Sequence, residues 1–494
     1  MDGCPEVCYL QGLFQNPEVC LTFHYTALDG KLKELRLPVA NRKQADRVLA
    51  CGERVDGSSL FKGLVETALS DLYVVPVYRS AFFNPFTEQS LDFVCRYLTA
   101  DGSPAPFAPD NILRSAHDLL RKTRHVELHA LGELEFFLLS DPQRRLYACP
   151  RQHGYHNAPP FAKTAHLLDE MLRLITRITG SVKYGHSEVG FIESVRSDLE
   201  ELAGRTAEQL EVEFLPAPVE DMGTYLSLAR WIIRNVAYRH GCVATFTPKL
   251  EEGVAGNGLH VHVELRDADR NVMTGPEGKL SAPARRLIGG LCAYADSLTA
   301  FGNTVSSAYL RLVPHQEAPT CVCWSDMNRS AMIRVPLAWT GGVDLARRVN
   351  PQQEAPVADD GGRQTVELRS PDGSAMVHLL LAGMTLAAEL GLGSDEAAQT
   401  AESLYVTGNI FQDEQVLRRL GKLPRSCVES ARVLLEKRAL YEREKVFPPA
   451  VIDYVARLLQ AENDENMNGH LADLPADDRL HETRKIMHKD LHRH

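Results

Sequence analysis

Four short segments of the sequence place charged or imidazole side chains two residues apart among apolar residues: three pair acidic or imidazole groups, and the fourth pairs Glu367 with Arg369. They are residues 131–137, 210–214, 259–263 and 366–369. Successive side chains of a β-strand point to opposite faces, so each segment would carry its functional groups on one face. The groups of interest are Glu133, Glu135, Glu211, His260 and Glu367. Taken singly, each segment also fits an amphipathic strand whose polar face lies in water.

Several Glu and His side chains together supply the oxygen and imidazole ligands that bind Mg²⁺ or Mn²⁺. If the four strands line one cavity, carboxylates ~6 Å apart repel each other by roughly 3 kcal/mol at an effective dielectric constant near 20. Bound cations would offset that repulsion. Convergence of the strands therefore predicts a metal site, although convergence does not follow from the sequence itself.

Three arginines, Arg311, Arg329 and Arg334, lie within 24 residues of one another. The planar guanidinium matches carboxylate and phosphate groups, so arginines beside a metal site predict an anionic substrate such as a nucleoside triphosphate. Surface ion pairs are the alternative. The sequence has no GxxxxGK[ST] loop, and the glycine-rich segment 253–258 lacks the GxGxxG order. A dinucleotide-binding fold is therefore not favoured.

The surrounding pattern predicts strands first and then strands mixed with helices. Strands are expected at 21–26, 31–37 and 72–76, with Asp29-Gly30 as a hairpin turn. The Gly- and Pro-rich segment 100–106 is the expected domain boundary, and a helix capped by Asp110 or Asn111 should follow it.

The later part of the chain predicts more helices. Apolar spacing indicates a helix over 227–240 that stops at Gly241. From Cys427 onward the chain is expected to be mostly helical, with a polar loop at 462–468. The basic, His-rich residues 479–494 favour a solvated or docked tail over a metal site.

Composition narrows the class of protein. The 494 residues are 44% apolar and 24% charged, which is typical of a globular chain with two domains. The net charge of −11 argues against nucleic acid as the main partner. Eleven cysteines without a CxxC pair predict free thiols in a reducing compartment. The absence of a leader pattern at Met1 and of a long apolar run predicts a cytoplasmic protein without a membrane partner.

Five blocks in order resemble the signature blocks of the glutamine synthetase family. They are residues 132–137, 256–262, 311–319, 328–330 and 367–372, with further similarity at 55–59 and 70–76. The resemblance extends from about residue 20 to residue 440. It implies an α+β fold with a β-grasp domain over 1–104 and a catalytic domain over 105–494. That catalytic domain would hold a curved antiparallel sheet flanked by helices, followed by a helical tail.

The resemblance also implies a homo-oligomer of stacked rings, a decamer or dodecamer, whose active sites lie between subunits. It divides the metal ligands into two sets. One set would hold the metal nearer the amino-acid substrate, and consists of Glu135, Glu188 and Glu211. The other would hold the metal that bridges the ATP phosphates, and consists of Glu133, His260 and Glu367.

Glu188 rests on the resemblance alone. In this chain 22 residues separate it from Glu211, whereas the family has only a few residues between the corresponding positions. An insertion over 190–207 explains the difference in spacing. Asp198 and Glu201 are weaker candidates for the same ligand position.

The resemblance further implies how the substrates would be bound. Arg311 and Arg369 would hold the substrate carboxylate or the transferred phosphoryl group. Arg329 and Arg334 would contact the nucleotide phosphates, with His262 beside them.

The amine and the amino acid would be bound by a different group of residues. Asp56 and Glu317 would form an ammonium pocket, in which one carboxylate attracts the cation and one takes its proton before attack. Asp56 and Ser59 would act on the adjacent subunit's site. The Gly256 carbonyl would accept from the ammonium group of the amino acid.

The implied activity is ATP-dependent ligation of ammonia to the side-chain carboxylate of L-glutamate, through a γ-glutamyl phosphate. Ala255, the pair His315-Gln316 and residues 376–378 depart from the family pattern. These departures fit a divergent glutamine synthetase. They also fit a related ligase that joins glutamate to an organic amine or uses another carboxylate. A catalytically silent structural or regulatory homologue is disfavoured, because unpaired buried polar ligands are costly to keep.

Overall fold

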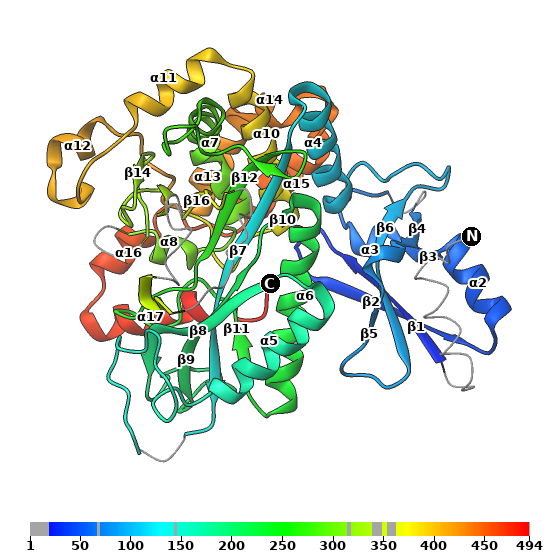
Figure 1. Ribbon diagram of the computed structural model, residues 1–494. Helices are drawn as coiled ribbons and strands as arrows, with labels where there is room; N and C mark the ends of the chain where they lie inside the picture. The colour runs from blue at the N-terminus through cyan, green and yellow to red at the C-terminus, as the bar shows by residue number, and fades with distance from the viewer. Residues whose placement is uncertain are drawn as a thin grey trace.

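A computed structural model describes residues 19–66, 70–142, 146–313, 318–337, 348–352 and 362–493. Strands and helices are interspersed along the chain and form two separate sheets, which confirms the α+β prediction (Figure 1). The N-terminal sheet and its small helices lie to one side of a larger helix-covered sheet. Residues 100–106 connect the two parts, and the domain limits 1–104 and 105–494 stay a prediction.

The N-terminal sheet runs in the order β2-β1-β6-β4-β3, with β5 paired to β6. The turn at Asp29-Gly30 joins β1 to β2 as an antiparallel hairpin, and Gly30 has a φ of +85°, which favours glycine. All three predicted strands of this region are therefore confirmed. The elements are β1 (Val19–Thr26), β2 (Leu32–Val39), α2 (Arg42–Cys51), β3 (Glu53–Asp56), α3 (Gly57–Leu60), β4 (Asp71–Pro76), η2 (Tyr78–Ser80), β5 (Phe82–Phe83) and β6 (Ser90–Leu98).

The larger sheet has ten strands, of which seven follow the order β14-β15-β16-β12-β7-β9-β8. Neighbours along this path are antiparallel except the parallel pair β14 and β15. The remaining three pair with β7 or β12. The strands are β7 (Glu127–Ser140), β8 (Val182–Ile192), β9 (Thr206–Phe214), β10 (Ala217–Pro218), β11 (Val243–Thr245), β12 (Leu259–Asp267), β13 (Arg270–Asn271), β14 (Trp324–Asp326), β15 (Ile333–Val335) and β16 (Val366–Leu368).

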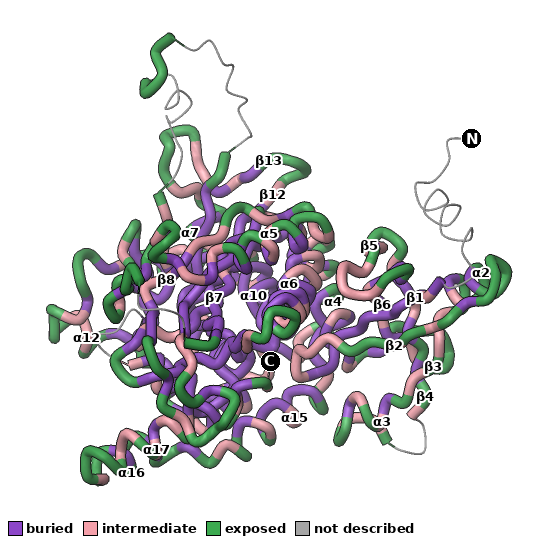
Figure 2. Tube along the Cα trace, turned by 90° about the horizontal axis from the view of Figure 1, so that it is seen from below, coloured by how far each residue is buried: buried purple, intermediate pink, exposed green. Residues whose placement is uncertain are grey.

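Helices cover this sheet and enclose the main core. The almost entirely apolar helix α10 (Val377–Leu392) is buried and packs against α4 (Pro109–Arg124) and α7 (Ala282–Gly302). Figure 2 shows the buried residues concentrated there. The other helices are α5 (Ala165–Thr179), α6 (Val219–Arg239), α8 (Ala308–Arg311), α11 (Asp395–Ser403), η3 (Ile410–Gln412), α12 (Glu414–Arg419), α13 (Cys427–Glu436), α14 (Arg438–Glu442), η4 (Arg443–Lys445), α15 (Pro449–Gln460), α16 (Met467–Asp473) and α17 (Ala476–His488).

Three expected boundaries are corrected. The residue before the first turn of α4 is Ala108, with Pro109 in the first turn, so neither Asp110 nor Asn111 is the cap. The helix expected over 227–240 starts earlier, at Val219, because Val219, Met222 and Leu226 continue its buried face at helical spacing. The loop expected at 462–468 ends when α16 begins at Met467. The mostly helical C-terminal part is confirmed.

None of the helices within the described ranges is by itself long and apolar enough to cross a membrane. The bent pair α10 and α11 reaches the required length and composition only in combination, with a bend of 108° between the two helices. The cysteines within the same ranges are free thiols, as predicted.

Candidate functional site

Strand register brings the predicted functional groups together. Strand β7 lies between β12 and β9, so that Glu133 is opposite His260 and Glu135 is opposite Glu211. The convergence assumed from the alternating pattern is therefore found in the structure. The cavity over these strands measures about 350 Å³. The predicted residues that line it are Glu133, Glu135, Glu188, Glu211, Gly256, His260, Arg311, Arg329 and Arg369.

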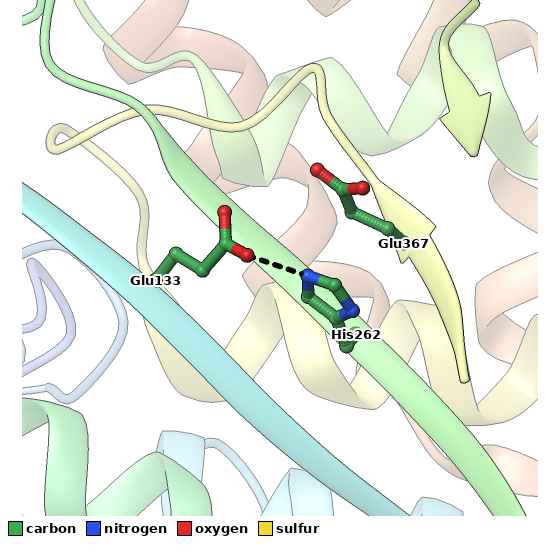
Figure 3. Close-up of side chains that lie close together, drawn as sticks. All are labelled: Glu133, His262 and Glu367. Carbon is green, nitrogen blue, oxygen red and sulfur yellow. Dashed lines mark hydrogen bonds and ion pairs between the residues drawn. The ribbon is translucent and has the colours of Figure 1, made fainter. Parts of the chain in front are cut away.

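One group of possible metal ligands spans three neighbouring strands. Glu133 of β7, His262 of β12 and Glu367 of β16 each offer a ligand atom within 4.8 Å of the others (Figure 3). Glu133 pairs with both histidines, at 2.9 Å from His262 Nε2 and 2.9 Å from His260 Nδ1. His260 Nδ1 also lies 3.7 Å from a Glu367 oxygen, so both imidazoles adjoin this group.

The carboxylates of this first group are held in their ionised form. Burial acts against ionisation, but His262 and His260 bring the pKa of Glu133 well below its usual value. Glu367 is buried too, and Arg369 leads the groups that lower its pKa. Arg334 Nη1 is a second cationic partner, 2.8 Å from Glu367 Oε2. Ionised carboxylates with imidazole suit a divalent cation.

A second group lies at the other side of β7. His186 and Glu188 of β8 and Glu211 of β9 offer ligand atoms within 4.8 Å of one another. His186 Nε2 lies 3.2 Å from Glu211 Oε1, and His186 Nδ1 lies 3.8 Å from Glu188 Oε1. Strand β8 shifts its register between Ser187 and Phe191, at the position of Glu188.

Glu211 has the opposite electrostatic environment to Glu133. Burial raises the pKa of Glu211 well above its usual value, and the negative charges of Glu133, Glu135 and Glu188 raise it further. A divalent cation among these oxygens would remove that repulsion and favour the ionised form. The second group therefore also has the character of a cation site.

The two geometric groups differ from the two sets implied by the resemblance. Glu135 Oε2 accepts hydrogen bonds from Gly258 N at 2.6 Å and Gln209 Nε2 at 3.3 Å, while His186 stands with Glu188 and Glu211. His262 stands with Glu133 and Glu367 where His260 was expected. The division of the ligands between two metals stays a prediction.

His186 is a candidate ligand that the sequence reasoning missed. A usable signal was present, because His186 and Glu188 stand two residues apart on one strand like the other pairs. The weaker candidates Asp198 and Glu201 lie elsewhere, near His481 at 3.6 Å and His492 at 2.9 Å. The positions of the three carboxylates therefore favour Glu188, which lines the cavity.

The four predicted arginines differ in what they contact around the first group. Arg311 is buried, and its guanidinium donates to the carbonyls of Ser370 at 3.0 Å and Arg369 at 3.3 Å. Arg329 and Arg369 reach the cavity wall, and Arg369 also donates to Glu367. Arg334 meets the first group through its ion pair with Glu367. Gly256 lines the cavity, and its carbonyl accepts a hydrogen bond from Gln209 Nε2 at 3.0 Å.

The residues predicted for the ammonium pocket do not meet within the described chain. Asp56 accepts from Ser59 Oγ at 2.6 Å and from Ser58, and these bonds lower its pKa to about 2. Asp56 is the last residue of β3, and Ser59 lies in the short helix α3 that follows. Both elements lie away from β7 and β8 in Figure 1 and in Figure 2. Glu317 lies outside the described residues.

The departures from the family pattern have different locations. Ala255 lines the cavity. His378 is buried beside Gly223 of α6, where burial lowers its pKa to about 4. The pair His315-Gln316 lies outside the described residues. Of the described departures, Ala255 is the one that meets the candidate site.

Comparisons with known proteins agree on one family. A family model described as the catalytic domain of glutamine synthetase matches residues 107–471. The glutamine synthetase of Thermus thermophilus is 28% identical over 382 residues, 75% of this chain and 76% of that protein. The glutamine synthetase of Pyrococcus horikoshii is 29% identical over 436 residues, 86% of this chain and 84% of that protein.

Solved structures show the same fold. A cryo-electron microscopy structure of Plasmodium falciparum glutamine synthetase has a TM-score of 0.73 and 17% identity, covering 97% of this chain and 98% of its own. A solved complex of GmaS with ADP has a TM-score of 0.72 and 19% identity, covering 95% and 98%. At these identities the structural likeness concerns the fold alone.

Proposed function

The chain belongs to the glutamine synthetase family, and on that premise we propose that it ligates ammonia to the side-chain carboxylate of L-glutamate with ATP. The observation that supports this most is the presence of two adjacent carboxylate and imidazole groups, of which Glu133 of the first and all three members of the second line one cavity. ATP phosphorylates the glutamate side chain, and ammonia then displaces phosphate from the acyl phosphate to give glutamine.

The donor atoms fit Mg²⁺ or Mn²⁺, because carboxylate oxygens and imidazole nitrogens suit both ions. Glu133, Glu367 and a histidine would hold one ion, and Glu188 and Glu211 would anchor the other. When bound, the cations supply charge stabilisation for the phosphates of ATP.

The arginines in the cavity wall, together with Arg334 beside Glu367, bind and orient the anionic groups. Arg311 and Arg369 hold the substrate carboxylate or the phosphoryl group in flight, whose charge spreads over its equatorial oxygens. Arg329 and Arg334, with His262, hold the nucleotide phosphates. Fixed guanidinium groups need little reorganisation as the charge moves, and this lowers the barrier.

The ammonium pocket needs a second subunit in this proposal. Asp56 is ionised at neutral pH because its pKa lies at about 2, so it can attract ammonium. Asp56 and Ser59 belong to β3 and α3 and are not among the described residues that line the cavity of their own chain, which supports sites shared between neighbouring subunits of stacked rings. Glu317 takes the proton from ammonium before attack.

A second candidate is a ligase that joins glutamate to an organic amine or uses another carboxylate. Ala255 supports it, because this small apolar residue forms part of the cavity wall at a position that departs from the family pattern. Its neighbour Gly256 carries the carbonyl assigned to the amino acid. A change in this wall alters the part of the cavity that is assigned to the amino-acid substrate, and it leaves both groups of metal ligands complete.

A substrate panel distinguishes the two candidates. The purified protein is given ATP and Mg²⁺, and phosphate release is measured with glutamate, other carboxylates, ammonium and primary amines in all pairs. We expect release that requires glutamate and ammonium together, and formation of glutamine. Phosphate release that requires a primary amine and does not occur with ammonium would reject the ammonia ligase in favour of the second candidate. A Glu133→Ala protein prepared in parallel controls for contaminating ATPase.

A further inference from the structure

The insertion and the C-terminal tail pack against each other beside the cavity. Both had no assigned role from the sequence. We call residues 476–493 the C-terminal clamp, and residues 249–256, of which 253–256 line the cavity, the wall loop. The clamp consists of α17 and the five residues after it, and lies against the larger sheet (Figure 1).

Apolar contacts hold the end of the clamp in place. Leu491 is buried in a small cluster separate from the main core. Val195 and Leu202 of the insertion belong to this cluster, as do Leu250 and Val254 of the wall loop. The side chain of one C-terminal residue therefore packs with the insertion and with the cavity wall at once.

Hydrogen bonds also join the clamp to residues 245–251. The hydroxyl of Thr245 donates to the Leu491 carbonyl, and that of Thr247 to the Met487 carbonyl, each at 2.9 Å. Arg484 Nε donates to Glu251 Oε2 at 3.0 Å. These bonds fix the clamp against the residues immediately before the wall loop and against the loop itself.

His488 lies at the centre of the contact. Its Nε2 is 2.9 Å from the Leu250 carbonyl, which can only accept, so Nε2 carries the proton. Its Nδ1 is 2.9 Å from the hydroxyl of Ser197, within the insertion. Burial lowers the pKa of His488, in agreement with a neutral ring that donates at one nitrogen and accepts at the other.

The wall loop transmits this contact to the cavity. Lys249 Nζ donates to the Val254 carbonyl at 2.6 Å, so the start of the loop is tied to its middle. Residues 253–256 then line the cavity, and the Gly256 carbonyl accepts a hydrogen bond from Gln209 Nε2. A shift at Leu250 would therefore move the segment that faces the substrate.

We propose that the C-terminal clamp positions the wall loop for binding of the carboxylate substrate, and that His488 is the central positioning residue. His488 touches no reacting atom and acts through Leu250 and Lys249. The kinetic part of this proposal rests on the proposed ligase function. The structural part, restraint of the wall loop, does not.

Three variants test the proposal. His488→Ala removes the donor to Leu250, and His488→Gln keeps a donor at nearly the same place. His481→Ala is the matched control, because His481 lies on the same helix, is exposed, and has Asp198 at 3.6 Å as its partner. Each full-length protein is compared by hydrogen exchange of the wall loop, by oligomeric state, and by kinetics with glutamate varied at saturating ATP.

In His488→Ala we expect exchange in the wall loop to quicken about tenfold and the KM for glutamate to rise about five- to tenfold, the effect of one lost buried hydrogen bond. The kcat and the KM for ATP should change less than about twofold. His488→Gln should restore both readouts, and His481→Ala should match the unmodified protein.

Unchanged exchange in the wall loop of His488→Ala would overturn the proposal. An even rise of exchange over the whole chain with loss of kcat would overturn it as well, because that pattern reports general destabilisation. If no protein of the set turns over any substrate pair, the exchange readout still decides on the clamp, and the proposed function fails by itself.

Discussion

Replacing Glu211 by Gln should make the metal-free protein more stable and abolish its stabilisation by metal. Glu211 is buried among Glu133, Glu135 and Glu188, and these charges together with burial raise its pKa. Gln keeps the shape of the side chain and removes its charge. The substitution therefore removes the repulsion and a metal ligand in one step.

The size of the effect follows from the separation of the carboxylates. Ligand oxygens of Glu188 and Glu211 lie within 4.8 Å of each other. Two full charges at that distance repel by roughly 3 kcal/mol at an effective dielectric constant near 20. Because Glu211 relieves part of this by taking a proton, we expect a gain of about 1–2 kcal/mol in EDTA at pH 8.

The sign of the pH dependence can be checked in the same experiment. The pKa of Glu211 in the folded protein lies above its ordinary value of about 4.5, so the folded state binds more protons over that interval. Stability of the metal-free protein therefore falls as pH rises from about 4.5 until Glu211 ionises. The Glu211→Gln protein should lack this loss.

Urea unfolding in EDTA and in Mn²⁺ measures all of these quantities. The unmodified protein should gain about 2.7 kcal/mol at a Mn²⁺ concentration 100 times the dissociation constant, and Glu211→Gln should gain far less. Glu208→Gln is the matched control on the same strand. Its carboxylate accepts from Lys163 N, Thr164 N and Thr164 Oγ1, so its loss should destabilise by about 1–3 kcal/mol with or without metal.

The reasoning is refuted if Glu211→Gln is destabilised in EDTA as much as Glu208→Gln is. Retention of the full Mn²⁺ gain in Glu211→Gln would also refute it. Either result would mean that the carboxylates are not mutually repelling ligands of a bound cation.

Two further predictions concern the contact between subunits and the junction of the two sheets. Glu135→Ala and Asp56→Ala should each be inactive, and mixing them under subunit exchange should restore part of the ligase activity; failure of every exchanged mixture would reject shared sites. At the junction of the two sheets, burial favours the neutral form of Glu220, but His117 and Arg96 lower its pKa to about 2. The ionised carboxylate therefore stabilises the fold above about pH 4.5, and this stabilisation is lost as pH falls towards 2. Glu220→Gln should lower the free energy of unfolding by about 1–3 kcal/mol at pH 7 and weaken its dependence on pH between pH 5 and 3. Urea unfolding that gives the same pH dependence for the variant and the unmodified protein would contradict the assignment.

The strand pattern was accessible from the sequence because side-chain alternation is a local property of the backbone. Glu133 and Glu135 had to share a face of any strand that contained them, and likewise His260 and His262. The signature blocks extended this to the family, which the match over residues 107–471 supports. The helix boundaries were less predictable, since apolar burial extends α6 back to Val219.

The grouping of the ligands required the tertiary structure. Glu133 meets His260 and His262 across more than 120 residues of sequence, through the register of β7 and β12. No local rule decides which of two imidazoles on one strand face joins Glu367, or that His186 joins Glu211. Register depends on hydrogen bonds between distant segments, and a slip of one residue would turn every group away.

The insertion and the tail show the same division between sequence and structure. The sequence by itself determined that extra residues separate Glu188 from Glu211 and that the C-terminus is rich in basic residues and histidine. Only the tertiary structure decided that Ser197 of the insertion meets His488 of α17 beside the wall loop. Composition is carried by each residue alone, whereas contacts between segments nearly 300 residues apart arise from packing of the whole chain.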